Sequence, residues 1–167
     1  MSLSIRTAKP EDAELIEDLA RRTWPDTFAA ILSEAQIEYM LKMMYAPAVL
    51  RRQMNDGHVF LLIYRADEAI GYLGYEAPYR DGETLKIHKI YVLPEAQGTG
   101  AGGRLMRAVE SAANYLCLRV LELNVNRYNR AIDFYLKCGF VTVATEDIDI
   151  GNGYLMEDFR MVKKLKL

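Results

Sequence analysis

The spacing of hydrophobic and polar residues changes along the chain, and the first third reads as one strand followed by helices. Residues 2–8 alternate between apolar and polar positions, which predicts a short strand. From Pro10 onward apolar residues recur three and four positions apart, and early acidic residues suit a helix start. Three helices are expected: one from Pro10 that stops at Trp24-Pro25-Asp26, one over residues 33–45 with Ser33 as its cap, and a short one over 47–54.

From His58 the pattern becomes that of strands, and helices return later. Three strands are predicted over residues 58–65, 70–79 and 85–93, joined by tight turns. A helix over 104–116, a strand over 119–125 and a helix over 129–138 follow. Two final strands flank Gly151-Asn152-Gly153, a strong hairpin signal. This order of elements predicts an α/β protein with a single mixed central β-sheet flanked by helices.

Length and composition restrict the class of protein. A chain of 167 residues is expected to form a single domain, residues 1–167. Its 51% hydrophobic and 26% charged residues are typical of a globular protein, and a net charge of −2 argues against nucleic-acid binding. We find no signal peptide and no membrane-spanning run, so a cytoplasmic protein without membrane association is expected. Two cysteines and two histidines predict neither disulfides nor a metal site.

A glycine-rich loop carries the main chemical signal. The strand over 85–93 runs through Pro94-Glu95-Ala96 into Gln97-Gly98-Thr99-Gly100-Ala101-Gly102-Gly103, and a helix follows. Glycines let backbone N–H groups converge, and the helix dipole adds positive charge at its N-terminus, so this arrangement predicts a phosphate site.

Two nucleotide-binding motifs are alternatives for this loop. A Walker loop does not fit, because no Gly-Lys-Ser/Thr follows. A dinucleotide-binding fingerprint fits formally at Gly98, Gly100 and Gly103, with Glu122 about 20 residues further on. Four residues separate the glycines from the strand, however, and about 40 residues after Glu122 are too few to complete such a sheet. A loop without a ligand is the remaining alternative.

Two motifs resemble those of the GNAT N-acetyltransferases. Residues 97–102 match the family's Gln/Arg-x-x-Gly-x-Gly/Ala motif, and residues 129–140, NRAIDFYLKCGF, resemble its N-x-x-A-x-x-F-Y-x-x-x-G-F pattern. Both stand in the expected order. Within the family the chain resembles the PaiA-type polyamine N-acetyltransferases in residues 24–28, in IGYLGY and in residues 150–158. The resemblance implies the GNAT fold, with acetyl-CoA bound where central strands splay apart.

The resemblance also implies residues that bind acetyl-CoA, the co-substrate. The pyrophosphate would be held by Gln97, Gly98, Thr99, Gly100, Ala101, Gly102, Gly103 and Arg104, and the pantetheine arm would pair with Ile90, Tyr91 and Val92. Asn129 matches a position that contacts the coenzyme arm, although it could equally cap its own helix. Lys137 and Arg104 could add charge near the phosphates or be ordinary surface cations.

Two residues are candidates for proton transfer. Tyr135 falls on the family's catalytic tyrosine and is expected to protonate the departing thiolate, with a core aromatic role as the alternative. His88 lies on the strand before the loop, on one face with Lys86 and Ile90, and is the candidate base for the acceptor amine. Related PaiA-type members tend to have an acid there. A hydrogen-bonded or substrate-lining histidine is the alternative.

The expected function is acetyl transfer from acetyl-CoA to a primary amine on a small molecule, with spermidine or spermine as examples. Alternatives on the same fold are acetylation of a protein or peptide amine or of an antibiotic, and a non-catalytic acyl-CoA-binding sensor. Acidic residues such as Glu76, Glu157 and Asp158 could hold a polycation. A homodimer is a further expectation, by analogy with the fold alone.

Overall fold

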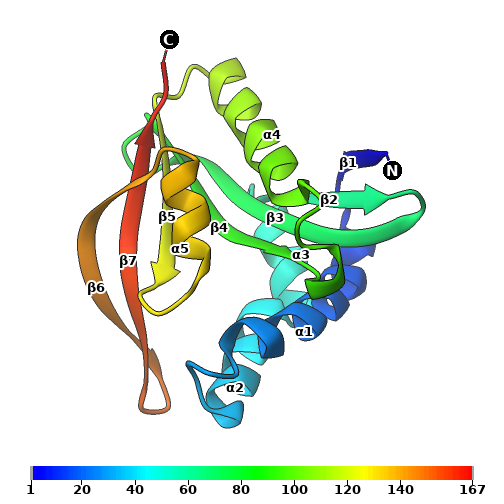
Figure 1. Ribbon diagram of the computed structural model, residues 1–167, viewed down its shortest axis with the longest axis vertical. Helices are drawn as coiled ribbons and strands as arrows, with labels where there is room; N and C mark the ends of the chain where they lie inside the picture. Colours follow the sequence, from blue (N-terminus) through cyan, green and yellow to red (C-terminus); the bar gives the residue numbers. More distant parts are fainter. Residues whose placement is uncertain (1, 167) are drawn as a thin grey trace.

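A computed structural model of the chain describes residues 2–166. Seven strands form one sheet in the order β1-β2-β3-β4-β5-β7-β6, in which β4 and β5 are parallel and the other neighbours antiparallel (Figure 1). The strands are β1 Leu3–Thr7, β2 Val59–Arg65, β3 Glu68–Tyr79, β4 Thr84–Val92, β5 Val120–Asn126, β6 Val141–Gly151 and β7 Tyr154–Lys164. The predicted mixed sheet is therefore confirmed.

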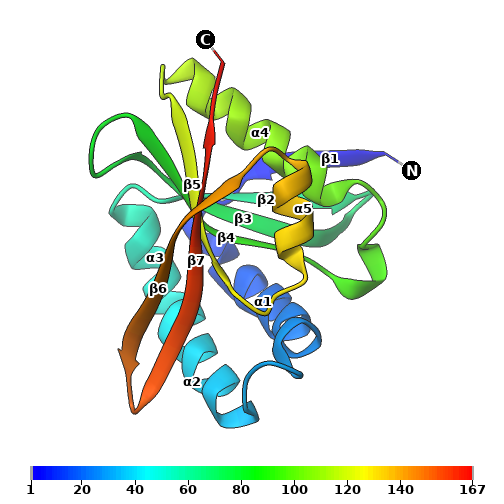
Figure 2. The same cartoon turned by 60° about the vertical axis from the view of Figure 1, so that its left-hand side comes forward.

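Helices cover both faces of the sheet. They are α1 Ala13–Phe28, α2 Glu34–Tyr45, α3 Pro47–Asn55, α4 Ala101–Tyr115 and α5 Ala131–Lys137, and two 3₁₀ turns, η1 Pro10–Asp12 and η2 Pro94–Ala96, precede α1 and α4. The group α1–α3 lies on one side, and α4 and α5 lie on the other (Figures 1 and 2). Among the helices within residues 2–166, none is sufficiently long and apolar to cross a bilayer.

The first helix does not stop where the sequence pattern predicted. α1 continues through Pro25 to Phe28, so the expected stop at Trp24-Pro25-Asp26 is wrong. A proline this near the end of a helix removes only one backbone hydrogen bond. Continuation buries Trp24 and Phe28, whose ring centroids are 4.6 Å apart, in the core. The gain from burying two aromatic rings exceeds the loss of one hydrogen bond.

Local signals elsewhere fix the elements as expected. The Ser33 hydroxyl accepts a hydrogen bond from the Gln36 N–H at 3.1 Å and caps α2. Asn152 and Gly153 both have positive φ, 55° and 80°, between the paired residues Gly151 and Tyr154. Two left-handed residues make the turn that suits the twist of a hairpin, so β6 and β7 pair as the sequence predicted.

The sheet splits between its two central strands. β4 and β5 pair only over Thr84–Ile87 and Val120–Leu123. Beyond these residues β4 stays with β3 up to Val92, whereas β5 stays with β7 up to Asn126. The two halves of the sheet diverge from this point, as Figure 2 shows for β4 and β5.

A β-bulge marks the place where the split begins. Gly74 on β3 pairs with Lys89, and the next residue, Tyr75, pairs with Ile87, so His88 is the extra residue on β4. A bulge bends its strand and shifts the alternation of side chains by one. The bend directs the rest of β4 away from β5.

Candidate active site

A cavity of about 1460 Å³ occupies the space between the diverging strands. Its lining comes from β4, β5, β6 and β7, from the loop before α4, and from α1, α2 and α5. A volume of this size exceeds that of a typical small-molecule pocket and is sufficient for two ligands together. The site therefore lies where the sheet offers unpaired strand edges and a helix N-terminus at once.

The glycine-rich loop forms one end of the cavity. Gly98 and Gly100 have φ of 82° and 86°, the left-handed region that favours glycine, and a side chain at either would point into open space. Gly100 precedes α4 directly, and its carbonyl accepts the Arg104 N–H at 3.0 Å. The positive end of the α4 dipole thus faces the cavity through a loop without side-chain obstruction.

The loop's other glycines have a different role. A methyl group at Gly102 would lie 3.3 Å from the ring of Phe134, so this glycine lets α4 pack closely against α5. Most of the predicted phosphate-binding residues line the cavity: Gln97, Gly98, Gly100, Ala101, Gly102 and Gly103. The motif therefore combines a ligand-facing turn with a helix contact.

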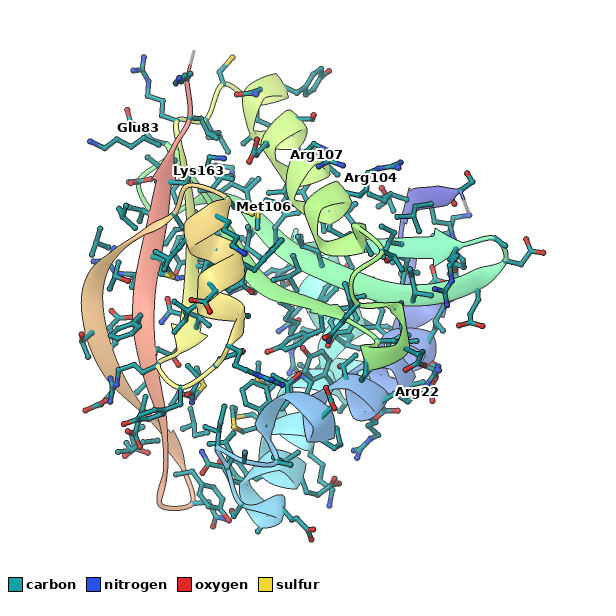
Figure 3. All side chains as sticks on the ribbon, in the orientation of Figure 1. Arg22, Glu83, Arg104, Met106, Arg107 and Lys163 are labelled. Atoms are coloured by element: carbon teal, nitrogen blue, oxygen red, sulfur yellow. The ribbon has the colours of Figure 1, made fainter. Side chains whose placement is uncertain are left out.

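Three residues proposed for the phosphates lie outside the cavity lining. The Thr99 hydroxyl donates to the Ala96 carbonyl at 2.6 Å and closes the turn. The Arg104 guanidinium donates to the Leu3 carbonyl at 3.2 Å, on the side of α4 nearest β1 (Figure 3). Lys137 is exposed at the end of α5. These side chains hold the scaffold or face solvent.

Ile90, Tyr91 and Val92 all line the cavity from β4. The bulge changes which of these side chains face the α1–α3 side of the sheet, because Lys89 pairs with Gly74 and Tyr91 pairs with Tyr72. Tyr91 packs against Trp24 of α1, with ring centroids 5.7 Å apart. The expected common face of Lys86, His88 and Ile90 is therefore wrong: beyond His88 the face continues through Lys89 and Tyr91.

Asn129 lines the cavity and also supports its own helix. Its side-chain oxygen accepts the Ala131 N–H at 2.8 Å, at the start of α5. The helix begins two residues later than the sequence predicted, so Asn129 satisfies a first-turn donor from just outside the helix. Asn129 thus has the structural role of supporting the start of α5, and its side chain also lies at the cavity.

Tyr135 is buried on α5 and its side chain lines the cavity. Its ring packs against Phe134 and Phe140, with centroid distances of 5.5 and 6.0 Å. Burial raises the pKa of the phenol well above its ordinary value. Tyr135 therefore keeps its proton at neutral pH, and it is a core aromatic that also lies at the cavity.

His88 forms part of a cluster of three titratable groups. Its Nε2 lies 3.0 Å from Glu76 Oε1, and Nε2 of His58 lies 3.4 Å from the same oxygen. The two imidazoles stack with centroids 5.0 Å apart, and Tyr79 meets His88 edge-on at 5.7 Å. Burial lowers the pKa of both histidines, and the hydrogen bond to Glu76 partly offsets this for His88. Both rings are thus neutral at pH 7.

A polar network crosses the cavity wall that β4, β5, β6 and β7 form. The Lys86 ammonium donates to Glu122 at 2.7 Å and to Asn124 at 2.6 Å, across the last paired residues of β4 and β5. Asn124 in turn donates to Glu146 and Asp158 on β6 and β7, at 2.9 and 3.2 Å. Burial raises the pKa of Asp158. Glu122, the ribose-binding candidate of the dinucleotide alternative, is engaged in this network instead.

Sequence reasoning missed His58 and Lys89, and it considered Glu76 only as a carboxylate for a polycation and not as a partner of His88. His58 follows α3 and Glu76 lies on β3, so neither belongs to a motif with His88. Lys89 is also buried in the cavity wall, where it donates to Gln53 at 2.8 Å, and burial lowers its pKa to about 8. The available signal was the position of charged residues inside otherwise apolar strands, at Lys86, Lys89 and Glu122.

Comparison with known proteins agrees with this geometry. Residues 28–163 match the family model described as "Acetyltransferase (GNAT) domain". The chain is 29% identical to a spermidine N(1)-acetyltransferase of Thermoplasma acidophilum, over 94% of this chain and 97% of that protein. It is 32% identical to an uncharacterized N-acetyltransferase of Mycobacterium tuberculosis, over 92% of this chain and 98% of the relative.

Solved structures share the whole fold. The crystal structure of a PaiA N-acetyltransferase from T. acidophilum in complex with coenzyme A superposes with a TM-score of 0.83, at 27% identity and over 99% and 100% of the two chains. The ribosomal-protein-S18-alanine N-acetyltransferase of Escherichia coli shares the fold, with a TM-score of 0.75 at 13% identity over 99% and 96%. The sheet, its splayed centre and the matching family model together show that this chain belongs to the GNAT family of acetyltransferases.

Proposed function

We propose that this acetyltransferase moves the acetyl group of acetyl-CoA to a primary amine of a small polycation such as spermidine or spermine. The observation that carries the proposal is the cavity between β4 and β5, which joins a helix N-terminus, a buried tyrosine, a neutral histidine and several carboxylates. The 29% identity to a spermidine N(1)-acetyltransferase supports the choice of acceptor.

The residues present fit the coenzyme. The backbone of Gly98–Gly103 and the α4 dipole offer N–H donors and positive potential to a pyrophosphate. Beyond Ile87, β4 has lost β5 as its neighbour, so one edge of residues 88–92 can pair with an extended amide chain such as pantetheine. The similar chain that was crystallised with coenzyme A shares this fold.

His88 serves as the base in this proposal. A primary amine with a pKa near 10.4 is neutral in only about one molecule in 2,000 at pH 7, so it must lose a proton before attack. The Glu76 carboxylate only accepts hydrogen bonds, and Nε2 of His88 therefore carries its hydrogen toward Glu76. Nδ1 of His88 remains with a free lone pair. Glu76 is thus a positioning residue that fixes the tautomer.

Tyr135 completes the transfer as the acid. The amine nitrogen attacks the thioester carbonyl, a C–N bond forms and the C–S bond breaks. The departing thiolate takes the Tyr135 phenol proton, and the phenolate regains a proton from solvent. The ammonium form of the acceptor yields an N-acetylamine, free coenzyme A and one released proton. The phenol is in its protonated form at pH 7, as any phenol with a pKa near 10 or above is.

The acceptor end of the cavity offers a carboxylate to a cation. Glu122, Glu146 and Asp158 line the cavity, together with the cations Lys86, Lys89 and Arg160. Glu122 pairs with Arg160 and Lys86, at 3.4 and 2.7 Å, and Glu146 pairs with Arg160 at 3.8 Å. Asp158 is therefore the carboxylate most available to the second ammonium of a polyamine. A peptide amine with a single charge or a sensor role gains no comparable feature.

An amine panel tests the proposal. Thiol release from acetyl-CoA is measured with spermine, spermidine, putrescine, a monoamine of matched length, lysine peptides and aminoglycosides. We expect polyamines to have a kcat/KM at least about tenfold above that of the monoamine, because a second ammonium engages the carboxylates. Preference for a peptide or an aminoglycoside would refute the polyamine assignment. Coenzyme binding without release for every amine would favour a sensor.

A further inference from the structure

The two histidines of the chain meet at one carboxylate. His58 lies just before β2 and His88 lies 30 positions later on the bulge of β4, yet both Nε2 atoms contact Glu76 Oε1, at 3.4 and 3.0 Å. One ligand atom from each residue lies within 4.8 Å of the other two. Both histidines line the cavity. Such a set was not expected, because the three residues have no metal-ligand spacing in the sequence.

The donor set and its dimensions match those of zinc. Two imidazoles and one carboxylate with an open fourth position form a recognised zinc arrangement. Zinc-to-ligand distances near 2.0–2.1 Å place neighbouring donors of a tetrahedral site about 3.3 Å apart. Two of the three distances between donor atoms are already close to this value: Glu76 Oε1 lies 3.4 Å from Nε2 of His58 and 3.0 Å from Nε2 of His88. The third distance, between the two imidazoles, shortens if one of the stacked rings tilts. His88 is partly exposed and has the cavity beside it, so its ring has room to tilt.

We propose that His58, Glu76 and His88 reversibly bind a zinc ion and that the bound ion stops acetyl transfer. The inhibition rests on the proposed function, in which His88 is the base. Zinc on Nε2 of His88 leaves that ring's hydrogen on Nδ1, so the lone pair for the acceptor amine is lost. The ion also adds positive charge where a cationic acceptor must approach.

The surroundings indicate a removable ion and no permanent metal centre. Nδ1 of His58 is buried without a hydrogen-bond partner among residues 2–166. A tightly held metal ligand usually donates this second nitrogen to a carboxylate or carbonyl. Without that support the site should release zinc to a chelator.

Calorimetric titration with zinc sulfate tests binding apart from catalysis. The wild-type chain should bind zinc saturably, and His58→Ala and His58→Gln should each weaken binding at least about tenfold. Cys117→Ser and Cys138→Ser are the matched controls, because these free thiols are the other soft donors. Binding unchanged in both His58 variants, or lost in a cysteine variant, would overturn the site.

Activity measurements then test the inhibitory role. With EDTA present, the rate at which each variant turns over acetyl-CoA and spermidine is measured first and serves as that variant's own reference. Zinc should inhibit the wild-type enzyme, EDTA should restore it, and His58→Gln should resist inhibition at the same zinc concentration. Saturable zinc binding at His58 with full activity would refute inhibition and leave the metal site intact. If neither protein acetylates any amine, the titration still decides the zinc site while the proposed function fails.

Discussion

The end of the cavity that we assign to the coenzyme, residues 90–92 and 97–103, consists largely of backbone groups. The end that we assign to the acceptor consists of side chains from five strands. At the coenzyme end, Gly98 and Gly100 expose N–H groups and the α4 terminus supplies the field. At the acceptor end, His88, Glu76 and Asp158 come from β4, β3 and β7. One end depends on the path of the chain, and the other on which side chains the sheet brings together.

This difference determines which residues can be substituted at each end of the cavity. A backbone site tolerates change at most side chains but not at the left-handed glycines, so it keeps one ligand class. A side-chain site can exchange a carboxylate or an imidazole without altering the fold, so acceptor choice can differ among proteins of one architecture. Substitutions at the two ends should therefore affect different kinetic constants.

The largest effect is expected at Tyr135, where the two ends meet. Tyr135→Phe keeps the buried ring and removes only the phenol proton, so turnover should fall about 10²-fold or more. Acetyl-CoA affinity should remain nearly unchanged, as measured by thermal shift. Tyr115→Phe, at an exposed tyrosine at the end of α4, is the control and should keep full turnover. Full turnover in Tyr135→Phe would remove the phenol from the mechanism.

A smaller effect is expected at the acceptor end. His88→Gln should lower turnover with spermidine about 30-fold, somewhat below the usual contribution of a general base, because water in the open cavity can accept the proton in its place. The matched control is His58→Gln, which removes the neighbouring imidazole from the same cluster. Equal losses in both variants would indicate a structural cluster and contradict the assignment of His88 as base.

The smallest effect is expected at the coenzyme end. Gly100→Ala forces a side chain into a left-handed conformation at a cost of about 1 kcal/mol, and the KM for acetyl-CoA should rise roughly fivefold. Gly82→Ala is the matched control: its φ is 78°, and it also faces open space, but it lies in the β3–β4 turn. Both variants should lose similar stability, and only Gly100→Ala should change the KM. A shift in both would mean that strain alone weakens the coenzyme site.

Prediction from sequence succeeded where the signal was local. Alternation, helical spacing and the turn at Asn152-Gly153 located nearly every element, and the loop motif located the α4 terminus. It failed at Pro25, because a local breaker signal could not reveal that Trp24 and Phe28 are buried together. It also failed to place Ile90, because a bulge depends on how β4 pairs with β3.

The sequence by itself determined the order of elements, the family motifs and a glycine loop suited to phosphate, since each depends on neighbouring residues. Only the tertiary structure decided that β4 and β5 separate after Ile87 and that His58, Glu76 and His88 converge. The same holds for the network from Lys86 to Asp158. These contacts join residues 12 to 38 positions apart. Strand pairing, register and the bulge set them, because backbone hydrogen bonds across the sheet fix which distant side chains share a face.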